Sequence, residues 1–101
     1  MAFTPEEQAV LCELSYRDIK TSPQDPVSLY EVLTDPKMNL DGELGDGYKG
    51  TLKGLREKVK DKDYHIVRSV DNDDTSGFVA LAISDPDNNV TVVCRGSEDL
   101  S

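Results

Sequence analysis

The spacing of the apolar residues changes between residues 60 and 64 of this chain. Before that point they recur every three or four positions, which is the spacing of a helix with one buried face. After it they occupy consecutive or alternate positions in short runs bounded by turn residues, which is typical of strands. We therefore expect a single α+β domain over residues 1–101, helical in 4–62 and a β-meander in 64–95.

The first helix has the clearest start signal in the chain. Thr4 suits the N-cap, Pro5 suits the first helical position, and Glu7 completes a capping box. The apolar face of this helix is expected to extend to about residue 19. It comprises Val10, Leu11, Leu14 and Ile19.

Two further helical segments are expected before residue 62. Residues 27–34 offer one or two helical turns, and residues 35–50 are rich in Gly, Asp and Asn and are expected to form a loop. Residues 48–60 then predict a third helix with leucines and a valine on one side. Basic residues occupy its other side: Lys49, Lys53, Arg56 and Lys60.

Three strands are expected in the last part of the chain, at residues 64–70, 77–84 and 90–94. The short connections between them predict antiparallel neighbours, with 77–84 in the centre of a three-stranded meander. The second and third strands carry consecutive apolar residues, so both faces of the sheet require cover. About three helices are available to cover at least one of those faces.

Composition limits the partners of the chain. Twenty acidic residues against eleven basic ones give a formal net charge of −9, which opposes binding to nucleic acid. No apolar run approaches the ~20 residues of a membrane span. The first residues lack the pattern of a signal peptide, and the two cysteines lie in apolar segments, so we expect a cytoplasmic protein with buried thiols.

Most catalytic and ligand-binding patterns are absent from the sequence. The acidic loops lack the glycine and the final acid of a calcium-binding EF-hand loop, and no glycine cluster carries the lysine of a phosphate loop. His65 is the single histidine, and no G-x-S-x-G presents a nucleophilic serine. We expect no metal site and no cofactor.

The end of the chain resembles part of a known enzyme family. Residues 77–80 read Gly-Phe-Val-Ala, and the apolar strand that follows ends in Arg95, Gly96 and Ser97. This pair of strands resembles the early part of class-three lipases and related α/β-hydrolases. In those proteins a Gly-aromatic-Val-Ala strand pairs with a strand that ends in Arg-Gly-Thr or Arg-Gly-Ser. Residues 11–19, LCELSYRDI, are similar to the first helix of the same group.

The resemblance implies a role for Ser97. In the family, the hydroxyl residue after Arg-Gly lies in the oxyanion hole, where preorganised donors stabilise the negative oxygen of an acyl-transfer intermediate. Ser97 matches this position, with Arg95 and Gly96 as its motif. The nucleophile elbow and the later Asp and His of the family have no counterpart in this sequence. The resemblance therefore implies an N-terminal module that is catalytically incomplete alone and related to hydrolases as part of a longer protein.

The last strand also suggests an alternative function. An apolar strand at the edge of a sheet is a template for pairing with another chain. Residues 90–94 include four that would form such an interaction edge: Val90, Val92, Val93 and Cys94. This alternative is a small acidic protein-interaction module, which uses the edge to form a homodimer or to bind a protein partner by β-augmentation.

Overall fold

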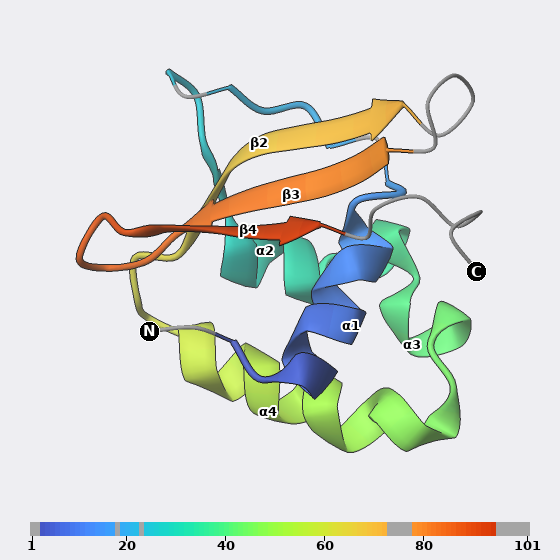
Figure 1. Ribbon diagram of the computed structural model, residues 1–101. Helices are drawn as coiled ribbons and strands as arrows, with labels where there is room; N and C mark the ends of the chain where they lie inside the picture. Colours follow the sequence, from blue (N-terminus) through green and yellow to red (C-terminus); the bar gives the residue numbers. More distant parts are fainter. Residues whose placement is uncertain (1–2, 18, 23, 73–77, 95–101) are drawn as a thin grey trace.

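Helices cover one face of a four-stranded antiparallel sheet in this protein (Figure 1). The structure is a computed structural model, and it describes residues 3–17, 19–22, 24–72 and 78–94. The helices are α1 (Pro5–Leu14), α2 (Leu29–Thr34), α3 (Leu40–Glu43) and α4 (Lys49–Val59). The strands are β1 (Val27–Ser28), β2 (His65–Asn72), β3 (Phe78–Ser84) and β4 (Val90–Cys94), in that order across the sheet. The α+β class and the meander of the last three strands are confirmed.

The start of α1 follows its sequence signal. The side-chain oxygen of Thr4 accepts a hydrogen bond from the backbone N–H of Glu7 at 3.1 Å. The Glu7 carboxylate in turn accepts one from the backbone N–H of Thr4 at 2.9 Å. These two bonds satisfy N–H groups that have no partner within the helix, so the capping box is complete.

The end of α1 differs from the prediction, because the helix stops at Leu14 rather than near residue 19. Polar side chains that follow Leu14 take over the last helical carbonyls. The hydroxyl of Ser15 donates to the carbonyl of Cys12 at 2.5 Å. The Arg17 guanidinium donates to the carbonyl of Glu13 at 3.3 Å and to that of Met38 at 3.0 Å. With their carbonyls satisfied in this way, the residues beyond Leu14 leave the helix.

Residues 35–50 are more ordered than the loop that their composition predicts. They contain α3 and two 3₁₀ turns, Pro36–Met38 and Asp46–Tyr48. The Asp35 carboxylate caps the first turn by accepting the backbone N–H of Lys37 at 2.9 Å. Leu40 and Leu44 are both buried in the core. Burial of these two leucines stabilises helical turns in a segment whose Gly and Asp content favours a loop.

The strand β1 is a further difference from the prediction. Two residues, Val27 and Ser28, pair with Ile66 and His65 of β2 within the region expected to be wholly helical. Such a short strand carries no periodicity that could distinguish it from the start of α2, because Ser28 also serves as the N-cap of that helix.

The core lies between the sheet and the helices. From the sheet, Ile66, Leu81, Ile83 and Val93 are each no more than 2% exposed. The register explains their common face, because Ile83 lies opposite Ile66 and Leu81 lies opposite Val93. The helices α1 and α2 contact this face, and α4 packs on α1 and α2 from the far side (Figure 1). Leu52, Leu55 and Val59 supply the buried side of α4, as predicted.

The helix α4 contains a glycine whose replacement tests the fold. A methyl group at Gly54 would meet no heavy atom within 4 Å. We expect Gly54→Ala to raise the free energy of unfolding by roughly 0.5–1 kcal/mol, because glycine in a helix interior loses more backbone entropy on folding than alanine. Urea unfolding followed by circular dichroism measures this change.

Gly42 of α3 is the control for that substitution. A methyl group there would lie 2.5 Å from the side-chain oxygen of Asn39. Gly42→Ala should therefore bring no comparable gain. An equal stabilisation by both substitutions would contradict the packing described around the two positions.

Candidate functional site

The sequence directs attention to the end of β4 and the residues that follow it. Arg95, Gly96 and Ser97, the predicted oxyanion-hole motif, lie outside the described residues. The structure does describe how the chain approaches them, through the turn at residues 85–89 and along β4. The candidate site is therefore built from this turn and this strand.

Asp85 organises the turn between β3 and β4. One of its carboxylate oxygens accepts backbone N–H groups from Asp87 and Asn89, each at 2.9 Å. Its own backbone N–H donates to the carbonyl of Asn89 at 2.9 Å. Asn88 adopts a left-handed conformation with φ of 65°, which asparagine tolerates better than most residues. The side chain of Asp85 thus fixes the turn from inside.

The hydrogen bonds at Asp85 also change its acidity. The side chain is 7% exposed, and burial by itself would raise the pKa of its carboxyl group. The backbone N–H of Asn89 outweighs this effect and, with that of Asp87, lowers the pKa of Asp85 below its ordinary value. The carboxylate is therefore charged at neutral pH and acts as a permanent acceptor within the turn.

The strand β4 is the last strand of the sheet on its side. Within the described residues it pairs with β3 alone, from Ser84–Val90 to Ala80–Cys94, without a register shift. Sheet edges in proteins are commonly protected by a bulge, a proline or a charged side chain. Residues 90–94 carry neither proline nor charge. The edge of β4 therefore offers a straight and uncharged template for another strand.

The four residues of the predicted interaction edge are not equivalent. Val90 and Val92 are 57% and 60% exposed, and alternation along the strand places them on the face opposite the buried Val93. Val93 points to the opposite face and is 2% exposed, so its side chain belongs to the core. The side chain of Cys94 lies outside the description. The exposed apolar surface of this strand is thus formed by Val90 and Val92.

Neighbouring strands extend this open face. Ala82 of β3 lies opposite both Val92 and Arg68, so the three residues form a row across the sheet. Ser84 likewise lies between Val90 and His65. In Figure 1 all the labelled helices lie on the other side of the sheet. The consecutive apolar positions of β4 predicted cover on both faces, and the helices of the described chain cover one.

His65 lies beside two serines but forms no catalytic pair with them. Its cross-strand neighbours are Ser28 of β1 and Ser84 of β3. The hydroxyl of Ser28 accepts the backbone N–H of Glu31 at 3.3 Å and so serves as a helix cap. No hydrogen bond joins His65 to either serine in the structure as described. These three side chains do not form a nucleophile with its base.

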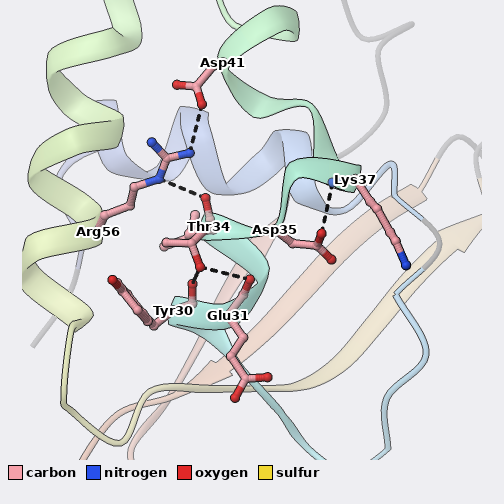
Figure 2. A network of polar contacts seen from close by, with 8 residues as sticks. Tyr30, Glu31, Thr34, Asp35, Lys37, Asp41 and Arg56 are labelled. Carbon is pink, nitrogen blue, oxygen red and sulfur yellow. Dashed lines mark hydrogen bonds and ion pairs between the residues drawn. The ribbon is translucent and has the colours of Figure 1, made fainter.

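A second region with exposed polar groups surrounds α2. A hollow of about 220 Å³ lies beside this helix, and its lining is mixed: Ile19, Val27, Val32 and Met38 are apolar, and Lys20, Glu31 and Asp35 are charged. On the other side of α2, Arg56 donates to the carbonyl of Leu33 at 2.9 Å and to the Asp41 carboxylate at 3.2 Å (Figure 2). Figure 2 shows Arg56 reaching from α4 to both groups, so it joins α2, α3 and α4. The role of these hydrogen bonds is to hold the three helices together.

The described residues contain no group of three or more His, Cys, Asp or Glu side chains placed to hold a metal ion. None of the helices described is long and apolar enough to cross a membrane.

Comparisons with known proteins return no relative. No family model matches the chain, and neither a curated protein nor a solved structure is significantly similar to it.

The turn allows a test through pH. We expect Asp85→Asn to lower the free energy of unfolding at about pH 7, because the variant lacks the charge that the two backbone N–H groups stabilise. The pKa of Asp85 is lowered in the folded state, so its contribution is complete above the ordinary carboxyl pKa. The contribution is lost as the pH falls through the lowered value. The difference between the two proteins should therefore shrink as the pH falls below about 4, the ordinary pKa of an aspartate carboxyl group.

Urea unfolding at several pH values measures this difference, with Asp87→Asn as control. Asp87 is an exposed carboxylate in the same turn. A constant difference between Asp85→Asn and the parent across the acid range would show that the charge of Asp85 has no part in the stability of the turn.

Proposed function

We propose that this chain forms the N-terminal part of a lipase-like α/β-hydrolase and supplies half of its acyl-transfer site. The observation that supports this most directly is the position of β4. It is an uncharged edge strand with two exposed valines, and the Arg95-Gly96-Ser97 motif follows it at once. In the proposed enzyme, a further strand pairs along β4, and additional helices cover Val90 and Val92.

The chemistry assigned to the motif is stabilisation of charge. When an ester or amide carbonyl is attacked, its oxygen becomes negative, and donors already in place lower the barrier. In this proposal the backbone N–H and hydroxyl of Ser97 are those donors, and Gly96 lets the backbone turn sharply after β4. The nucleophile and its base come from outside the 101 residues. The turn held by Asp85 would support the site by fixing the strand that leads to it.

A cytoplasmic location is part of the proposal. The chain has two cysteines, at positions 12 and 94, and each lies in an apolar segment. Cys12 is partly buried rather than fully buried as expected, and it packs against the core. A small number of cysteines in apolar segments is typical of cytoplasmic proteins.

The experiment begins with the native gene product, captured from its own cells with an antibody against α1. We expect a mass well above 11.1 kDa and covalent labelling by a fluorophosphonate, which reacts with activated serines. In that protein, Ser97→Ala should reduce ester hydrolysis by up to roughly 10²–10³-fold in kcat, because one donor to the oxyanion is removed.

Ser84→Ala is the matched control. Ser84 lies at the end of β3 and is half-buried on the open face. This substitution should leave hydrolysis unchanged. A native product of 11.1 kDa that the fluorophosphonate does not label, alone or with bound proteins, would overturn the proposal.

A second candidate function rests on the same strand. The 57% and 60% exposure of Val90 and Val92, beside an edge that pairs on one side, also suits an acidic module that binds a partner by β-augmentation. The two functions differ in what occupies the edge. In the hydrolase it is a strand of the same enzyme fold, and in the interaction module it is a separate protein.

A further inference from the structure

The register of the hairpin identifies the backbone groups that lie on the free edge. The N–H of Asp85 donates to the carbonyl of Asn89 at 2.9 Å, so Ser84 and Val90 face each other without hydrogen bonds between them. Antiparallel pairs alternate between hydrogen-bonded and non-hydrogen-bonded. Thr91 therefore directs its N–H and C=O toward β3. Val90 and Val92 direct theirs away from β3, to the free edge.

The same two residues also carry the exposed side chains. Val90 and Val92 are more than half exposed on the face without helices. A strand that paired with β4 would take hydrogen bonds from their backbone groups. Its own alternate side chains would lie beside the two valines, which are neighbours on one face of a sheet. Backbone pairing and apolar contact are thus offered at the same positions.

Charge determines which strand fits this edge. Asp87 is exposed in the turn before β4, and the sequence after the strand contains Arg95, Glu98 and Asp99. The chain as a whole carries a net charge of −9. A second copy of the chain would bring the same large negative charge to this edge, which opposes self-pairing. A strand flanked by basic residues instead approaches a chain of opposite net charge.

From these observations we propose that the edge of β4 is a docking site for an extended segment of another protein. The segment is apolar at alternate positions and is flanked by Lys or Arg. Its backbone pairs with Val90 and Val92, and its apolar side chains lie against theirs. This inference rests on the second candidate function, and it adds the chemistry of the partner and the residues that bind it.

The test uses the full 101-residue chain, labelled with ¹⁵N, and a blocked peptide of sequence Lys-Lys-Thr-Val-Thr-Val-Thr-Lys-Lys. We expect amide shifts centred on Val90 and Val92 when the peptide is added, because their N–H groups gain partners. A twin peptide with Glu in place of each Lys should bind at least about tenfold more weakly, with a difference that narrows at high salt.

Two further comparisons separate strand pairing from general attraction between charges. A peptide with N-methyl groups on the amides that face β4 keeps its charge but cannot donate hydrogen bonds, and it should bind at least about tenfold more weakly. Val92→Lys should weaken binding of the basic peptide by a similar factor, since edge lysines oppose strand addition. Glu31→Gln changes the net charge by the same amount on α2 and should have little effect.

Three outcomes would overturn this inference. They are equal binding of the N-methylated peptide, shifts that centre away from β4, and self-association of the chain that protects the Val90 and Val92 amides instead. None of them bears on the hydrolase proposal, which depends on fluorophosphonate labelling of the native product. Conversely, an unlabelled native product leaves the peptide experiment intact.

Discussion

The packing of α1 on β3 and β4, and of α2 on β1 and β2, holds the two layers of this protein together. Leu81 and Ile83 point inward from the central strand, and both are buried. Side chains alternate along a strand, so a shift of one residue in register would turn these two outward and Ala80 and Ala82 inward. The register of the sheet therefore also determines which side chains the helices pack against. The exposed positions of Val90 and Val92 are a consequence of it.

The turn at Asp85 maintains that register at the open end of the hairpin. Its carboxylate holds the backbone of Asp87 and Asn89, and Asn88 accepts the left-handed conformation that the turn requires. The length and shape of the turn fix which residues of β3 and β4 face each other. A buried acid can serve this purpose because backbone N–H groups surround it. The same geometry lowers its pKa.

Much of the fold could be predicted from local patterns. The capping box placed the start of α1, and the apolar runs placed β3 and β4 to within a residue of their observed bounds. The errors arose where distant partners decide the structure. The carbonyl of Met38 holds Arg17 beyond the end of α1, and pairing with β2 makes a strand of Val27 and Ser28. Neither of these distant partners can be inferred from the residues adjacent in the sequence.

The candidate site, too, could be predicted only in part. Apolar composition predicted an edge over residues 90–94, but it could not show which of these side chains face the core. Val93 proved to be a core residue, because its partner Leu81 points toward the helices. The direction of the free backbone groups depends on the hydrogen bond between Asp85 and Asn89, which only the folded turn provides. The oxyanion-hole assignment of Ser97 depends on the resemblance of the sequence and remains a proposal.

The two edges of the sheet differ, so another strand can be added more readily to one edge than to the other. The edge opposite β4 is β1, which is two residues long, and beside it the hydroxyl of Thr21 donates to the carbonyl of Ile66 at 2.8 Å. Extended strands can therefore be added on the β4 side, where five residues are paired in sequence, and not to a comparable length on the other. Two copies joined through β4 would therefore form a pair and not a filament, since each copy would use its long edge in the contact. A strand that occupies β4 becomes the new edge on that side, so further growth of the sheet depends on the incoming strand.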